Sequence, residues 1–98
     1  MAFAMENKET NFQITILREF TQADFGDLSK VVQGILPAGK IYLTFDFTSG
    51  NFLHSKGVPG FPKIMESVIS AGSMLRIVCY AKDYTMFFRN VSGLKIGS

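Results

Sequence analysis

The residue types that could carry chemistry gather in one short stretch of this chain, NFLHSKGVPGFPK at residues 51–63. This stretch holds the only histidine, His54, directly before Ser55 and Lys56. A serine hydroxyl ahead of a helix can accept a hydrogen bond from a free N–H group of the first turn, which is a structural role. A phosphate on the same hydroxyl would meet the positive end of the helix and would add about two negative charges to the surface. Ser55 is therefore a candidate helix cap and a candidate phosphoacceptor.

His54 and Lys56 set the charge of this stretch. A partly protonated imidazole beside an ammonium group attracts anions, which suits a phosphate or an acidic partner. A lone histidine is also compatible with an ordinary exposed loop residue. An enzyme is not expected, because adjacent residues such as His54 and Ser55 seldom point at one another and no third residue is placed to orient them. The spacing of Gly57 and Gly60 matches neither a phosphate-binding loop nor a dinucleotide fingerprint.

Two prolines in the stretch limit where a helix can begin. Pro59 fits the first turn of a helix, but Pro62 lies seven residues after Ser55 and would interrupt a helix that began there. The sequence therefore predicts regular helix from about Pro62. Ser55 then lies in a loop ahead of the helix, where the helix dipole acts on it more weakly.

The same stretch is the predicted partner-binding surface. Three of its apolar side chains, Leu53, Val58 and Phe61, either form an apolar rim around the polar turn or belong in the core, with at least two of the three buried. The candidate partner-binding residues are Asn51, Leu53, His54, Lys56, Gly57, Val58 and Phe61.

Composition and charge exclude several classes of function. The 98 residues are 47% hydrophobic and 18% charged, which indicates one folded domain spanning 1–98. The net charge is only +2 and the basic residues are scattered, so nucleic-acid binding is not expected. Cys79 is the only cysteine and no cluster of metal ligands is visible, so neither a metal nor another cofactor is expected. Without a signal-peptide pattern or an apolar run of 18 residues, the expectation is a cytoplasmic protein that does not span a membrane.

Hydrophobic periodicity predicts the elements that position residues 51–63. Residues 12–20 alternate as a half-covered strand does, and residues 1–11 are either an edge strand or a loose N-terminus. Residues 21–36 repeat apolar side chains at helical spacing, with Thr21 as N-cap and Asp24 three residues on.

Two further strands and two further helices follow. Residues 40–47 and 74–81 are nearly continuous in apolar and aromatic character, which predicts central strands covered on both faces. Residues 62–72 between them form a helix that ends at Gly72. Residues 82–92 form a third helix with Asp83 as its cap. The fold class is therefore α/β, a single small domain with a central mixed, mostly parallel sheet of four to five strands and helices packed on it.

These elements carry a set of motifs that resembles a known family. Taken in order, the motifs resemble the STAS domain of bacterial anti-sigma-factor antagonists over about residues 12–97. The set consists of the strand IYLTFDF, the loop TSGNF, the turn LHSKGV, the helix end ISAGS, the strand LRIVCYA and the closing FFRNVSGLKI.

The resemblance implies a protein-binding module. In members of the family, the domain docks on an anti-sigma kinase and is switched by phosphorylation of a serine, whose position matches Ser55. His54 stands where the family has an aspartate. We also do not expect the last helix of the family in this sequence. Both differences favour an alternative, a non-phosphorylated STAS subunit of a membrane transporter ATPase.

Overall fold

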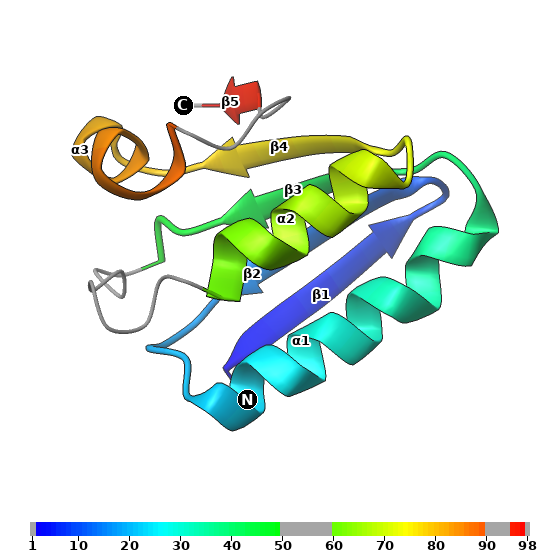
Figure 1. Ribbon diagram of the computed structural model, residues 1–98, viewed down its shortest axis with the longest axis horizontal. Coiled ribbons are helices and arrows are strands. Elements are labelled where there is room, and N and C mark those ends of the chain that lie inside the picture. Colours follow the sequence, from blue (N-terminus) through cyan, green and yellow to red (C-terminus); the bar gives the residue numbers. More distant parts are fainter. Residues whose placement is uncertain (1, 50–59, 90–94, 98) are drawn as a thin grey trace.

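The computed structural model describes residues 2–49, 60–89 and 95–97, and these residues form an α/β fold (Figure 1). The strands are β1 (Phe3–Lys8), β2 (Asn11–Ile16), β3 (Tyr42–Asp46), β4 (Met74–Val78) and β5 (Lys95–Gly97). The helical elements are α1 (Gln22–Ile35), the 3₁₀ turn η1 (Leu36–Ala38), α2 (Gly60–Ser70), α3 (Ala81–Asp83) and the π-helical turn η2 (Tyr84–Phe88). The α/β class predicted from the sequence is confirmed.

The sheet has the strand order β1-β2-β3-β4-β5. The β1–β2 pair is antiparallel, and the other three pairs are parallel. The edge strand proposed for residues 1–11 is present as β1. Because β2, β3 and β4 run in the same direction, their carboxyl ends meet at one edge of the sheet, the carboxyl edge.

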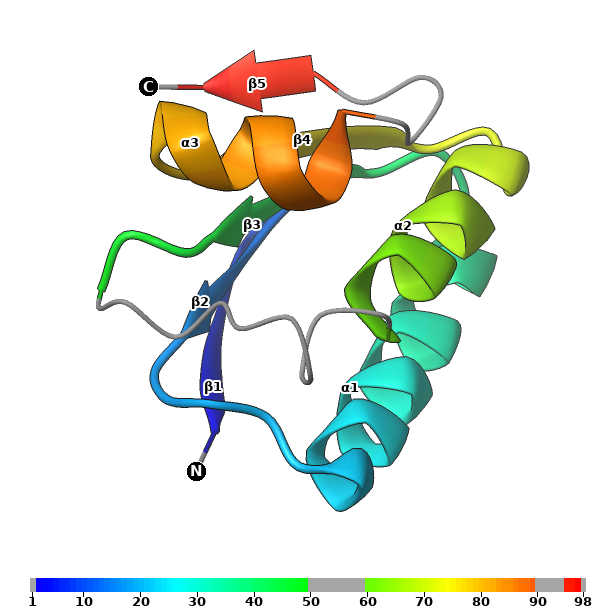
Figure 2. The same ribbon diagram turned by 60° about the vertical axis from the view of Figure 1, so that its left-hand side comes forward.

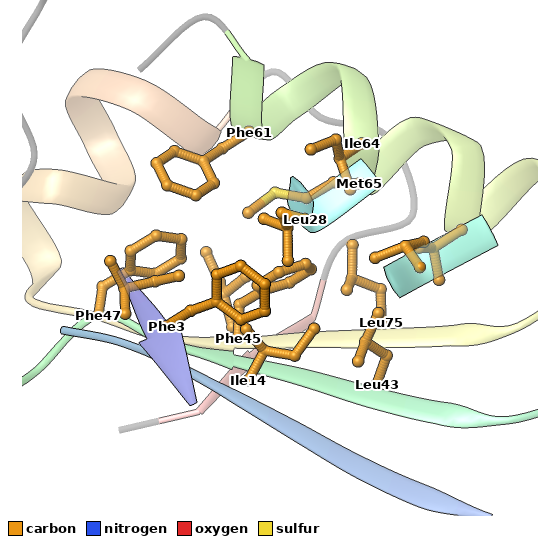
Figure 3. Close-up of a cluster of buried hydrophobic side chains, with 14 of the residues drawn as sticks. Phe3, Ile14, Leu28, Leu43, Phe45, Phe47, Phe61, Ile64, Met65 and Leu75 are labelled. Carbon is orange, nitrogen blue, oxygen red and sulfur yellow. The ribbon is translucent and has the colours of Figure 1, made fainter. Parts of the chain in front are cut away.

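Only one face of the sheet is covered by the described helices (Figure 2). Along β3 and β4 the buried residues alternate with exposed or half-buried ones. The prediction that both strands are covered on both faces is therefore wrong. The apolar runs suggested two covered faces because Tyr42 and Met74 are hydrophobic. Both side chains nevertheless lie on the open face, where they are 53% and 40% exposed. The covered face carries the core (Figure 3), with Ile14, Leu28, Leu43, Phe45, Met65, Val68, Leu75, Ile77 and Phe88 buried.

The start of α1 is fixed by the predicted cap. The Asp24 amide donates to Oγ1 of Thr21 at 3.3 Å, and the Thr21 amide donates to Oδ2 of Asp24 at 2.8 Å, which completes a capping box. Arg18 adds two hydrogen bonds to the same carboxylate, at 2.7 and 3.1 Å. The predicted N-cap at Thr21 is confirmed.

The predicted second helix is present as α2. Pro62 is its third residue, where the missing N–H costs nothing because first-turn amides have no partner within the helix. Gly72 ends the helix with a φ of +82°, the left-handed conformation that glycine adopts without strain. The next residue, Ser73, is buried, and its hydroxyl accepts a hydrogen bond from the Ile41 amide at 3.3 Å. This bond ties the end of α2 to the entry of β3.

The third helix differs from its prediction at the N-terminus. Its N-cap is Tyr80, whose backbone is extended, and Asp83 is the third helical residue, so the predicted cap at Asp83 is wrong. The Asp83 side chain is buried, with 5% exposed. The helix widens into η2, whose end is marked by the bond from the Arg89 amide to the Tyr84 carbonyl at 2.9 Å.

Candidate functional site

The candidate site lies in the connection between β3 and α2. Seven of the eight candidate residues, Asn51, Leu53, His54, Ser55, Lys56, Gly57 and Val58, lie outside the described residues. Their roles, including Ser55 as phosphoacceptor, stay predictions. The structure describes both ends of the connection, Ser49 and Gly60, and thereby fixes where the chain leaves the sheet and where it enters the helix.

Phe61 is the candidate residue that the structure describes, and it is part of the core. Its side chain is 3% exposed. Its ring lies 4.8 Å from that of Phe25, 4.9 Å from that of Phe20 and 5.1 Å from that of Phe47, between ring centroids. A partner cannot reach a side chain enclosed in this way, so its assignment as a partner contact is corrected in favour of the core alternative. The physical reason is that Phe61 lies on the inward face of α2 (Figure 3).

A polar turn leads the chain out of β3 at the carboxyl edge. Oδ1 of Asp46 accepts hydrogen bonds from the Thr48 amide at 2.8 Å and from the Thr48 hydroxyl at 2.6 Å. The Tyr80 hydroxyl, from beyond the end of β4, donates to the Thr48 carbonyl at 3.5 Å. The Phe47 amide donates to the Val78 carbonyl at 2.9 Å and extends the β3–β4 pairing up to this turn. The turn is therefore held to the two central strands just before the candidate stretch.

Neither Thr48 nor Tyr80 was selected from the sequence, although a signal for the first was available. An aspartate followed two residues later by threonine and then by Ser-Gly is a typical turn pattern, in which the carboxylate accepts from the backbone ahead of it. The contact of Tyr80 has no local signal, because the two residues are 32 positions apart.

The other end of the connection is fixed by a close contact between α1 and α2. A Cβ added to Gly60 would lie 2.5 Å from Cδ1 of Phe25, which no real Cβ atom tolerates. Phe25 is itself packed edge-on against Phe20, with the ring centroids 5.1 Å apart. Beside this contact lies a shallow groove of about 290 Å³ between the two helices, with Gly26, Ser29 and Lys63 among its lining residues. Gly60 thus lets the first turn of α2 rest directly on an aromatic ring.

Two titratable groups near the site have shifted pKa values. The hydrogen bonds from Arg18 and then from the Thr21 backbone lower the pKa of Asp24 from 3.8 to about 2. Burial, and secondly the charge of Asp83, raises the pKa of the Cys79 thiol. Both shifts hold the group in the form it has at neutral pH, a carboxylate and a thiol, which is the behaviour of structural residues.

Within residues 2–49, 60–89 and 95–97, no three metal-ligating side chains come together. No helix in this described part is long and apolar enough to cross a membrane. The sequence matches no protein-family model, and no curated protein matches it significantly. The STAS resemblance is therefore a hypothesis that depends on the residues of the chain itself.

Proposed function

We propose that this chain is a cytoplasmic protein-interaction module of the STAS type, similar to anti-sigma-factor antagonists. It docks on a partner such as an anti-sigma serine kinase through residues 51–63 and α2. The observation that carries the proposal is the position of this stretch. It joins the carboxyl end of a central parallel strand to the N-terminus of a helix, with the order of strand, loop, helix, glycine turn and strand that the resemblance implies.

The position is suited to binding for physical reasons. In sheets of parallel strands, ligands and partners meet the loops at the carboxyl ends, because the scaffold is rigid there and the connecting loops are free to vary. Here the rigid parts are the bonded turn at Thr48 and the contact of Gly60 with Phe25. A docking loop between two fixed points loses less conformational entropy on binding than a loop on a loose support.

Phosphorylation of Ser55 would act on this surface as a charge switch. A phosphoserine adds about two negative charges and favours nearby cations and free amide groups. The cations closest to Ser55 in the sequence are His54 when protonated, Lys56 and Lys63, which is exposed in the first turn of α2. A partner with an acidic docking surface would be repelled by the phosphate, so phosphorylation would release it.

The test is a phosphorylation assay with the anti-sigma-type serine kinases encoded in the same genome. The purified chain is incubated with kinase and ATP, and added phosphate is located by mass spectrometry. Ser55→Ala is expected to abolish the signal. Ser49→Ala is the matched control, since it removes a hydroxyl from the other end of the same connection, and it is expected to leave the signal unchanged. Phosphate on another residue would overturn the switch, and absence of both phosphate and kinase binding would overturn the docking proposal.

The second candidate function is a non-phosphorylated accessory subunit of a transporter ATPase. It is favoured by one specific observation, His54 in the place of the aspartate that precedes the phosphorylated serine in the family. The two functions differ in one measurement. A transporter subunit is expected to co-purify with the ATPase and to remain unphosphorylated, whereas a kinase antagonist binds the kinase in the dephosphorylated state.

A further inference from the structure

The segment from α3 to Arg89 has one buried side and one exposed side. Asp83 and Phe88 are buried, and Tyr84 is half-buried against the core. Lys82, Met86 and Arg89 are exposed, so all three face away from the core. These three residues are called the outer stripe.

The outer stripe combines an exposed apolar side chain with two positive charges. Met86 is 70% exposed, more than any other large hydrophobic residue in the described part of the chain. Lys82 and Arg89 stand on either side of it in the sequence. The acidic residue of the segment, Asp83, is 5% exposed, so its carboxylate is not at the surface to pair with these cations or to meet a partner. The stripe is therefore basic at both ends and apolar in the middle.

The outer stripe lies at the same edge of the sheet as the turn from which the chain enters the candidate docking loop. The helix begins directly after Tyr80, whose hydroxyl donates to the Thr48 carbonyl in the turn that leads to residues 51–63. Phe88, on the inner side, packs on Phe47 at the end of β3 with ring centroids 5.1 Å apart. Figure 1 shows α3 next to the carboxyl ends of β3 and β4. The stripe and the turn at Thr48 thus lie at one edge of the molecule.

We propose that Lys82, Met86 and Arg89 form the second half of the docking surface and contact an acidic protein surface that offers an apolar socket for Met86. This inference rests on the proposed function. It adds a requirement that the candidate loop alone does not specify, namely that the partner surface is acidic and has an apolar socket. Methionine is unbranched and polarisable, and it adapts to the shape of a partner's pocket. Flanking cations steer an acidic partner toward the site and accelerate association. A phosphate on Ser55 would add negative charge to the proposed docking surface and weaken that attraction.

The small size of the stripe favours an acidic protein over an anionic membrane as the occupant. Stable attachment to a lipid surface takes a larger apolar face or a cluster of about 4–8 basic residues, whereas the stripe offers one methionine and two cations. A protein interface, in contrast, needs only a few central anchors surrounded by a polar rim.

The experiment measures binding of the partner kinase to the full chain by calorimetry at two salt concentrations. The variants are Met86→Ala and the double charge reversal Lys82→Glu with Arg89→Glu. The matched control is Lys30→Glu with Lys40→Glu, which reverses the same number of exposed charges on α1 and before β3. Thermal unfolding of each variant checks the fold, which substitutions at exposed residues should leave intact. A parallel sedimentation assay uses vesicles of phosphatidylcholine with phosphatidylserine.

Binding is expected to weaken about tenfold or more in the double reversal and in Met86→Ala, and the salt dependence is expected to fall in the reversal but not in the control. If the wild-type chain binds the kinase and all variants bind equally well, the inference is overturned while the proposed function stands. If the wild-type chain does not bind the kinase, both are overturned. Vesicle binding that the double reversal abolishes, without a change in kinase binding, overturns the protein partner in favour of a membrane.

Discussion

Replacing Gly60 by alanine tests the contact that fixes the start of α2. The new Cβ would lie 2.5 Å from Cδ1, 2.7 Å from Cε1 and 2.8 Å from Cγ of Phe25. Non-bonded carbon atoms rest about 3.5–4.0 Å apart, so the ring has to move by about 1 Å. Phe20 and Phe61 restrict this movement, since both pack edge-on against the same ring. Forcing extra atoms into a packed site costs about 1–3 kcal/mol.

Gly26→Ala is the matched control for this change. Gly26 lies in α1, and a Cβ there meets nothing within 4 Å. Alanine is expected to stabilise the protein by about 0.5–1 kcal/mol at this exposed helical position. Gly60→Ala gains no more than this from helix propensity. The difference in unfolding free energy between the two variants therefore isolates the packing cost, and we expect it to be about 1–3 kcal/mol with Gly60→Ala the less stable.

The assay is urea unfolding at neutral pH, with free energies from linear extrapolation and unchanged slopes as the check that only stability has changed. The pair is then repeated in a Phe25→Ala background, where the obstructing ring is absent. In that background Gly60→Ala is expected to become neutral or stabilising. The double variant is then more stable than the sum of the two single effects predicts. Equal stability of Gly60→Ala and Gly26→Ala in the wild-type background would refute the reasoning.

Three further predictions concern pH, backbone conformation and thiol reactivity. Arg18 holds the pKa of Asp24 at about 2, down from 3.8, so the charged carboxylate contributes stability above about pH 4 that is lost as the pH falls through 2. Asp24→Asn should remove this pH dependence, seen as urea midpoints that no longer fall between pH 5 and pH 2. Gly72→Ala should destabilise the protein by about 1–2 kcal/mol, because a φ of +82° strains any residue with a Cβ; a wild-type melting temperature would contradict this. Burial raises the pKa of Cys79, so iodoacetamide at pH 7.5 should label it slowly in the folded protein and quickly after denaturation. Equal labelling rates in the two states would count against a buried thiol.

The parts of the fold that depend on neighbours in the sequence were predictable. The capping box joins Thr21 to Asp24, three residues apart, and the residue types at this spacing are enough to indicate it. Gly72 is likewise identified by its place after the last apolar residue of a helical repeat. The inward position of Phe61 also had a local signal, since it is followed at helical spacing by Ile64, Met65 and Val68, all buried in α2.

The parts that depend on distant neighbours were not predictable. The reason for a glycine at position 60 is a ring 35 residues earlier in the chain, and no local pattern connects the two. The open face of the sheet has the same origin, because the apolar character of Tyr42 and Met74 does not reveal that the described helices all lie on the other side. The candidate loop combines both difficulties, since its two ends are fixed by contacts with Phe25 and Tyr80 rather than by its own residues.

The start of α3 shows how a shift of three residues in the position of the cap changes a functional conclusion. With Asp83 as the cap, its carboxylate would lie at the surface and would offset one of the two positive charges of the outer stripe. The helix begins at Ala81 instead, because Tyr80 is the extended residue ahead of it, and this rotates Asp83 inward and leaves Lys82 and Arg89 outside. Burial of the Cys79 thiol, and secondly the charge of this carboxylate, raises the pKa of that thiol. The charge of the proposed docking surface therefore depends on where the helix starts as much as on its composition.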